Sequence, residues 1–199
     1  MTESVAERPE LKQIVGALLF AAQHPLTVDQ IRRVLSRVAE REGGAAKEYA
    51  EATPSHIRRA VEELRSGMKK SRPGFHIVEV AGGYRLENDV ACGPWLRQFL
   101  EKTKPGRLSV PALETLAVVA YRQPCTRAQV EEIRGVAVDA ILRKLLEMQL
   151  LRIVGRSDLP GRPWLFGTTQ KFLEHFGLNS LEDLPSREDL KQFDVRRPE

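Results

Sequence analysis

The chain has little of the chemistry on which metalloproteins and disulfide-bonded proteins depend. Its 199 residues include two cysteines, Cys92 and Cys125, and four histidines, scattered without the close spacing of a zinc site. Two distant cysteines favour a reducing compartment over a disulfide framework. We therefore expect no metal site and a cytoplasmic protein.

Long apolar runs and phosphate-binding glycine motifs are also absent from the sequence. The longest apolar run, residues 14–22, falls well short of the roughly 20 residues that a membrane-spanning helix needs. Neither G-x-x-x-x-G-K-[ST] nor G-x-G-x-x-G occurs, and no local spacing singles out a Ser–His–Asp or Cys–His arrangement. The sequence therefore predicts no membrane span, no cofactor and no enzymatic activity.

A strong excess of charge of one sign is missing as well. The net charge is +4, and residues 1–104 carry 17 basic and 14 acidic residues, against 14 and 13 in residues 105–199. Affinity for a nucleic-acid backbone comes mainly from Lys and Arg side chains that neutralise phosphates. Neither half of the chain is therefore typical of a strong DNA binder.

What the chain does contain is an internal repeat at an offset of 99 residues. The segment FAAQHPLTVDQI, residues 20–31, aligns with VAYRQPCTRAQV, residues 119–130. In each copy an apolar helix ends at a proline, and a threonine followed three residues later by glutamine predicts a capping box for the next helix. Two copies of one module therefore make up the chain.

Each copy continues with a third helix and a two-stranded hairpin. In the first copy the helix begins at Thr53-Pro54 and runs to about Ser71, and strands over 75–80 and 84–88 flank a Gly82-Gly83 turn. In the second copy the expected elements are a helix over 136–149, strands over 150–156 and 164–168, and a last helix that stops at Gly177.

Three helices followed by a hairpin is the element order of a winged helix. The expected fold class is therefore mainly α with small β-hairpins (α+β), arranged as tandem winged-helix domains. The predicted division is a flexible N-terminus (1–9), a first domain (10–104), a linker (105–109), a second domain (110–185) and a charged, flexible tail (186–199).

The third helices are poorly suited to reading DNA bases. On a helical wheel the exposed face of the second copy carries Asp139, Arg143, Lys144 and Glu147, with no Asn or Gln. The third helix of the first copy, residues 57–70, mixes basic side chains with glutamates in pairs such as Arg58–Glu62. A winged-helix transcription regulator is therefore the weaker alternative, and weak contact between the basic end of this helix and the DNA backbone stays open.

The first helix carries an aromatic residue on the side opposite to its apolar face. Phe20 lies there beside Gly16, and an exposed aromatic next to a glycine is typical of an interface anchor. The alternative is that the insertion over residues 41–53 folds over Phe20. The sequence leaves both interpretations open.

The stretch VGRSDLPGRPWLFGTT, residues 154–169, is interpreted as the wing of the second domain. Pro160-Gly161 predicts a type II turn, and Trp164 and Phe166 alternate onto one face, which we expect to be the core side. Arg156 and Arg162 are left at the wing tip. They either hold the hairpin to its own domain through Asp158 or reach a partner.

Residues 113–185 resemble the segregation and condensation protein B family. The blocks AYRQP-x-TR, IRGV, VGR-x-D-x-PGRP and GTT-x-x-FL-x-x-FGL follow one another in this order, and LLFAAQHPL near the start fits the same family. Cys125 departs from the branched aliphatic residue that is usual at its position. Trp164 and Phe166 replace an aliphatic–tyrosine pair.

The resemblance implies a function as well as a fold. It implies a non-catalytic homodimer, formed mainly by the N-terminal domains, that binds the kleisin subunit, segregation and condensation protein A, and through it the SMC ATPase. That complex compacts and partitions the bacterial chromosome, so the protein would be cytoplasmic and nucleoid-associated. It would touch DNA only weakly or indirectly.

We assign these two contacts to particular residues. For the kleisin we expect Tyr121, Arg122, Gln123 and Arg127, at the exit of the first helix of the second domain, because Tyr and Arg are enriched at interface hot spots. The alternative is that Arg122 or Gln123 satisfies carbonyls at the helix end. For the dimer we expect Phe20 and Gly16.

Overall fold

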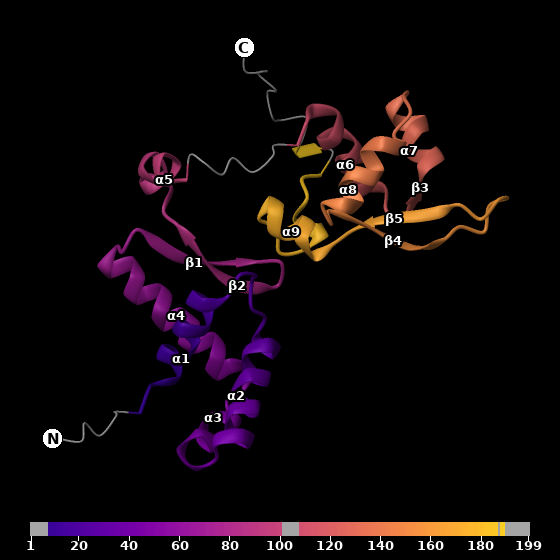
Figure 1. Ribbon diagram of the computed structural model, residues 1–199. Coiled ribbons are helices and arrows are strands. Elements are labelled where there is room, and N and C mark those ends of the chain that lie inside the picture. Colours follow the sequence, from indigo (N-terminus) through magenta and orange to yellow (C-terminus); the bar gives the residue numbers. More distant parts are fainter. Residues whose placement is uncertain (1–7, 101–107, 187, 190–199) are drawn as a thin grey trace. The chain divides into compact units, whose positions relative to one another are not determined.

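The computed structural model describes residues 8–100, 108–186 and 188–189. They fall into two compact units, Met1–Lys104 and Pro105–Glu199 (Figure 1). Each unit has a hydrophobic core of its own. The expected flexible N-terminus (1–9), linker (105–109) and tail (186–199) lie for the most part outside the described residues.

Three long helices and a hairpin form the framework of the first unit, with shorter helices between and after them. Its elements are α1 (Leu11–Ala21), α2 (Val28–Glu42), η1 (Gly44–Ala46), α3 (Lys47–Ala50), α4 (Pro54–Ser71), β1 (Phe75–Val80), β2 (Gly83–Asn88), η2 (Val90–Cys92) and α5 (Gly93–Phe99). Helix α4 packs against α1, α2 and β1. Its buried residues, Ile57, Ala60 and Val61, meet Val15 and Leu19 of α1 in the core.

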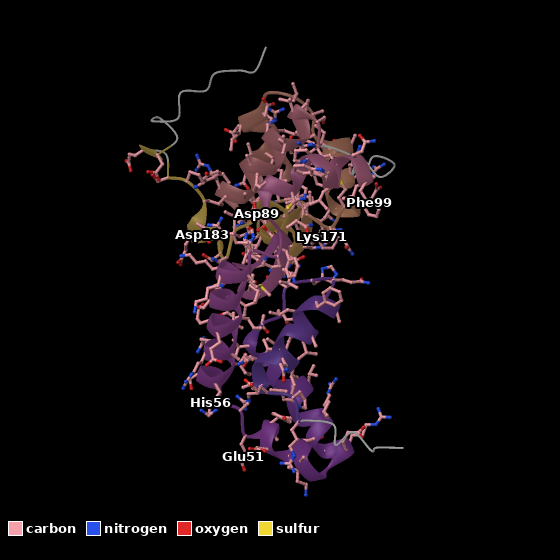
Figure 2. The ribbon with its side chains drawn as sticks, turned by 90° about the vertical axis from the view of Figure 1, so that its left-hand side faces the viewer. Glu51, His56, Asp89, Phe99, Lys171 and Asp183 are labelled. Atoms are coloured by element: carbon pink, nitrogen blue, oxygen red, sulfur yellow. The ribbon has the colours of Figure 1, made fainter. Side chains whose placement is uncertain are left out.

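Local caps explain where these helices begin. Thr27 Oγ1 accepts a hydrogen bond from Gln30 N at 3.2 Å, and Thr27 N donates to Gln30 Oε1 at 2.8 Å, which confirms the predicted capping box. Helix α4 starts at Pro54, as predicted, behind the cap Thr53. Figure 2 shows His56 at the start of α4 and Asp89 near its opposite end.

The insertion over residues 41–53 packs beside the start of α1 and does not reach its end. Tyr49 of α3 lies against the core, and its hydroxyl donates to the Pro9 carbonyl at 2.5 Å. Phe20, at the other end of α1, stays 81% exposed. The alternative in which the insertion covers Phe20 is therefore wrong.

The hairpin turn of the first unit lies one residue earlier than predicted. Val80 pairs with Gly83, so the two turn residues are Ala81 and Gly82, with φ of 54° and 70°. Two positive φ angles characterise a type I′ turn, whose twist matches that of the strands. Gly83 belongs instead to β2, at a point where the chain of Leu26 passes close by.

The second unit repeats this plan. It contains α6 (Val110–Arg122), β3 (Cys125–Thr126), α7 (Arg127–Arg134), α8 (Asp139–Glu147), β4 (Leu151–Arg156), β5 (Trp164–Thr168), α9 (Gln170–Phe176) and η3 (Leu181–Asp183). The three strands form a sheet in the order β3-β5-β4. Helix α8 is shorter than the predicted 136–149, because Gly135 ends α7 with φ of 69° and α8 begins only after Val138.

The two units share a strand contact that the sequence did not suggest. In the second unit Cys125 pairs with Phe166 of β5, and in the first unit Leu26, 99 residues earlier, forms an isolated bridge with Tyr84 of β2. In both cases the chain between the first and second helices lies against the return strand. Both units are winged-helix domains, mainly α with small antiparallel sheets.

Candidate functional site

Helix α6 leaves an apolar strip uncovered within its own unit. One side buries Ala112, Thr115, Leu116, Val119 and Ala120. The exposed side carries Val110, Leu113, Ala117 and Tyr121, which follow one another at three- and four-residue spacing and so lie on one face. This α6 strip ends at the turn where the kleisin contact was predicted.

Tyr121 and Arg122 are accessible at that turn. Tyr121 is 45% exposed, and its hydroxyl donates to the Pro185 carbonyl at 2.8 Å. Arg122 is exposed, and its side chain forms no hydrogen bond or ion pair with the described residues. One ring edge and one free guanidinium are therefore available to a partner.

Gln123 is committed to the fold. Its Oε1 accepts from Thr168 N at 2.7 Å and from Thr168 Oγ1 at 3.0 Å, and its Nε2 donates to the Ala120 carbonyl at 3.1 Å. The alternative in which Gln123 satisfies a carbonyl at the helix end is confirmed. Its side chain also continues the sheet, because it occupies the place where a longer β3 would pair with β5.

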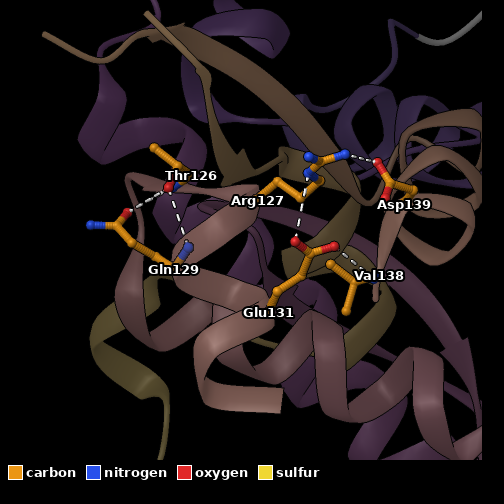
Figure 3. A network of polar contacts seen from close by, with 6 residues as sticks. All are labelled: Thr126, Arg127, Gln129, Glu131, Val138 and Asp139. Atoms are coloured by element: carbon orange, nitrogen blue, oxygen red, sulfur yellow. Dashed lines mark hydrogen bonds and ion pairs between the residues drawn. The ribbon is translucent and has the colours of Figure 1, made fainter. Parts of the chain in front are cut away.

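Arg127 joins α7 to the start of α8. It pairs with Asp139, the first residue of α8, and its Nε lies 3.7 Å from Glu131 Oε2 (Figure 3). Glu131 Oε1 in turn accepts from Val138 N at 3.1 Å and so caps a helix that has no capping side chain at Val138. Arg127 thus has an internal role, although about half of its side chain is exposed.

The wing-tip arginines are not held by Asp158. Within the described part of the chain no ion pair joins Asp158 to either arginine; instead the Arg156 guanidinium carbon lies 3.8 Å from the centre of the Trp164 ring, and Arg156 donates to the Arg162 carbonyl at 3.3 Å. Figure 1 shows this hairpin extending beyond the helices of its unit. Stacking on Trp164 therefore fixes Arg156 to its own wing.

The expectation that Trp164 faces the core is wrong. Phe166 is buried, whereas Trp164 is 46% exposed at the far end of β5. The strand reaches past the helices there, so no core lies beneath that end, and Arg156 covers the ring instead. The turn itself agrees with the prediction, because Gly161 has φ of 78° and Arg162 N donates to the Leu159 carbonyl at 2.8 Å.

Cys125 lies just before the capped start of α7 but is not a reactive thiol. It is 3% exposed and packs in the core of the second unit. Burial raises the pKa of the Cys125 thiol, which keeps it protonated and unreactive.

The predicted dimer residues differ in their surroundings. Phe20 lines a pocket of about 310 Å³ together with Leu19, Phe75 and Leu86, and the ion-paired Arg85 and Glu87 lie at its rim. A side chain at Gly16 would meet Leu64 of α4 at 3.5 Å. Gly16 therefore faces its own unit, and Phe20 is the residue of the two that is open to a partner.

Ion pairs on α4 connect different residues from those predicted. Arg59 Nε lies 3.1 Å from Glu63, and Arg65 pairs with Glu62 at 2.8 Å, so Glu62 binds Arg65 and not Arg58. Arg65 is drawn toward the hairpin because its guanidinium also lies over the Tyr84 ring and donates to the Ile77 carbonyl. Both pairs have ordinary helical spacing, i,i+4 and i,i+3, so spacing alone does not choose between Arg58 and Arg65 as the partner of Glu62. The contact of Arg65 with the hairpin favours Arg65.

One exposed surface was missed by the sequence reasoning. Trp95 and Phe99 of α5 are 74% and 85% exposed, and Leu100 follows them. The i,i+4 spacing of two aromatics on a short helix was the available signal.

The comparisons with known proteins assign the chain to a family. The family model described as "Segregation and condensation complex subunit ScpB" matches residues 13–187. The chain belongs to the ScpB family. Segregation and condensation protein B of Syntrophotalea carbinolica is 41% identical over 92% of this chain and 84% of its own length, and that of Geobacillus kaustophilus is 42% identical over 87% and 74%.

Solved structures of the same family are also similar. The crystal structure of ScpB from Mycobacterium tuberculosis is 32% identical, with a TM-score of 0.37, over 87% of this chain and 99% of its own. A dimer of the ScpB N-terminal domain complexed with ScpA peptide is 28% identical over 44% of this chain and 91% of its own, with a TM-score of 0.35.

Two other kinds of site have no candidate among the described residues. In those ranges, no three His, Cys, Asp or Glu side chains are placed to hold a metal ion. No helix there has both the length and the apolar character that crossing a membrane requires.

Proposed function

We propose that the protein is a non-catalytic, dimeric subunit that binds the kleisin of an SMC complex and supports chromosome condensation and segregation in the cytoplasm, at the nucleoid. The observation that carries this proposal is the family match over residues 13–187, which spans both winged-helix domains. Two exposed apolar surfaces, one in each unit, supply the contacts that a connecting subunit needs.

The second unit provides the kleisin surface in this proposal. The α6 strip offers apolar area, and Tyr121 and Arg122 lie at its end with an aromatic ring and an unpaired cation, the residue types that dominate interface hot spots. Gln123 and Arg127, predicted as contacts, act here by holding the turn in place through Thr168 and Asp139.

The first unit provides the dimer contact. Phe20 and Phe75 form the apolar centre of the patch, with the Arg85–Glu87 pair as its polar rim. An apolar centre within a polar rim is the usual anatomy of a protein interface.

The kleisin contact is tested by calorimetric titration of the full-length protein with the kleisin. We expect Tyr121→Ala and Arg122→Glu each to weaken binding by at least about tenfold, the effect of losing a hot-spot side chain. Arg143→Glu is the matched control, because Arg143 is an exposed arginine of the same unit with no ion pair among the described residues.

Three results count against the proposal. They are no measurable binding of the kleisin by the wild type, unchanged affinity in both variants, or an equal loss in the control. Thermal unfolding followed by circular dichroism shows whether each variant keeps the wild-type fold.

A further inference from the structure

The C-terminal end of α4 and the first part of the strand after it carry no carboxylate along the sequence. Residues 64–78 contain Arg65, Lys69, Lys70 and Arg72 and no Asp or Glu. Lys69 and Lys70 lie in the last turn of α4, and Arg72 follows as the residue that ends the helix with φ of 48°. All three are exposed. We call Lys69, Lys70 and Arg72 the α4 basic cluster.

Nearby acidic groups do not neutralise this cluster. Glu62 and Glu63 pair with Arg65 and Arg59 in the preceding turns of the helix. Asp89, on the loop beside the end of α4, accepts a hydrogen bond from Ala91 N at 2.9 Å. In the part of the chain that the structure describes, the three cations form no ion pair.

A hollow of about 740 Å³ lies beside the cluster. Lys69, Arg72 and His76 line it together with Asp89, and Met68, Phe75 and Ile77 supply apolar parts of its wall. The basic side chains therefore border a concave surface, and a linear polyanion is able to lie against them.

We propose that the α4 basic cluster binds the phosphate backbone of double-stranded DNA without reading its sequence. The helix advances about 4.5 Å from residue 69 to residue 72, and B-DNA carries one negative charge per about 1.7 Å of its axis. Each of the three cations therefore finds a phosphate within reach. Residues 64–78 include no Asn or Gln, the residues that read adenine edges, so the contact is to the backbone.

The composition of the cluster favours DNA over an acidic peptide. Between the cations the exposed residues are Ser66, Gly67 and Ser71, and none of them is an apolar anchor for a peptide. The exposed aromatic nearest in the sequence, Phe75, belongs to the proposed dimer patch. Peptide and protein interfaces depend on such anchors, whereas non-specific DNA binding is supplied by charge alone.

The second unit supplies an internal comparison. Its third helix, α8, carries Arg143 and Lys144, but Asp139 lies in its first turn and Glu147 at its end. The two carboxylates of α8 balance its two cations, whereas α4 carries five Lys and Arg residues against two Glu residues. The same winged-helix element is therefore basic in one unit and neutral in the other.

The test measures binding of the full-length protein, without kleisin, to a fluorescent 30-base-pair duplex of random sequence by anisotropy. The logarithm of the association constant is plotted against the logarithm of the salt concentration. If each bound protomer neutralises three phosphates, this plot has a slope of about −2.7 per protomer. That slope corresponds to a loss of roughly 40-fold between 50 and 200 mM salt.

Two variants with the same change in charge locate the contact. Lys69→Gln with Lys70→Gln removes two cations, and we expect the slope to fall in magnitude by about 1.8. Arg143→Gln with Lys144→Gln removes two cations from α8 and should leave both slope and affinity as in the wild type. Kleisin binding should persist in both variants, which separates this inference from the proposed function.

Each remaining outcome overturns the inference. If the wild-type protein does not bind the duplex at 50 mM salt, or binds it equally well at 200 mM salt, the DNA contact is excluded. An equal loss in the α8 variant assigns the binding to overall charge. If polyglutamate displaces the fluorescent duplex from the protein at an equal concentration of negative charge, an acidic peptide is the better ligand.

Discussion

Gln123 shows how one side chain can be committed to the fold although its position suggests an exposed contact. It follows the last residue of α6, yet its amide oxygen accepts from both the backbone and the hydroxyl of Thr168. The corresponding residue of the first unit, 99 positions earlier, is His24. A histidine has no amide oxygen, so the acceptor that Gln123 offers to Thr168 has no identical counterpart at residue 24.

Gln123→Ala should therefore destabilise the second unit. The change leaves the part-buried Thr168 N–H without its acceptor, and such a loss costs about 1–3 kcal/mol. Urea unfolding of the full chain measures the effect. Arg122→Ala, one residue away and exposed, should stay within about 0.5 kcal/mol of the wild type. Equal stabilities of the two variants would contradict the role assigned to Gln123.

At the scale of single elements, the hairpin of the first unit depends on two adjacent glycines for different reasons. Gly82 has φ of 70°, and a Cβ atom at this position would meet nothing within 4 Å, so the glycine serves the turn alone. At Gly83 a Cβ atom would lie 2.8 Å from the backbone of Leu26. That close approach allows the two hydrogen bonds between Leu26 and Tyr84, each 2.9 Å long.

Gly83→Ala should cost more stability than Gly82→Ala. A methyl group at residue 83 pushes Leu26 away from β2 and weakens the bridge, an overpacking effect of about 3 kcal/mol. At residue 82 the cost is the left-handed backbone alone, about 1 kcal/mol. Chemical unfolding of both variants ranks them. A larger loss at residue 82 would show that the turn, and not the contact with Leu26, limits the hairpin.

The elements also show which features were accessible from sequence. The starts of α2, α4 and α7 were predicted because a cap is a local arrangement of residues three positions apart. The side that Trp164 faces was not, because it depends on how far β5 extends past the helices. The choice of Arg65 over Arg58 as the partner of Glu62 likewise depends on the contact of Arg65 with the hairpin.

In the candidate site, too, local features were predicted from the sequence and long-range contacts were not. The turn after α6 was located by the repeat and by the polar residues that end an apolar helix. Which of its side chains are free was not accessible, because the partners of Gln123 and Arg127 lie 45 and 12 residues further along the chain. Only the folded unit brings Thr168 and Asp139 to them.

At the scale of the whole molecule, one fold is used twice with different surfaces. Each unit buries the same helical faces and brings the same segment against its return strand. What differs is the exposed side: Phe20, Phe75 and the basic end of α4 in the first unit, and the α6 strip in the second. Two units with the same plan and different exposed residues thus give one chain several separate candidate contacts.

The proposed dimer is the property of the whole molecule that a single substitution tests most directly. Phe20→Asp should convert the dimer to monomers at micromolar concentration, because it places a charge in the apolar centre of the proposed interface. The fold should survive, since Phe20 is 81% exposed and is not part of the core. Size-exclusion chromatography with light scattering gives the mass.

Phe99→Asp is the matched control, because Phe99 is the same residue type in the same unit and is 85% exposed. It should leave the dimer intact if the contact is centred on Phe20. If the Phe20→Asp variant remains dimeric, the interface does not include Phe20 and lies elsewhere on the first unit. Dissociation by Phe99→Asp alone moves it to α5, where Trp95 and Phe99 form the other exposed aromatic surface of that unit in the described residues.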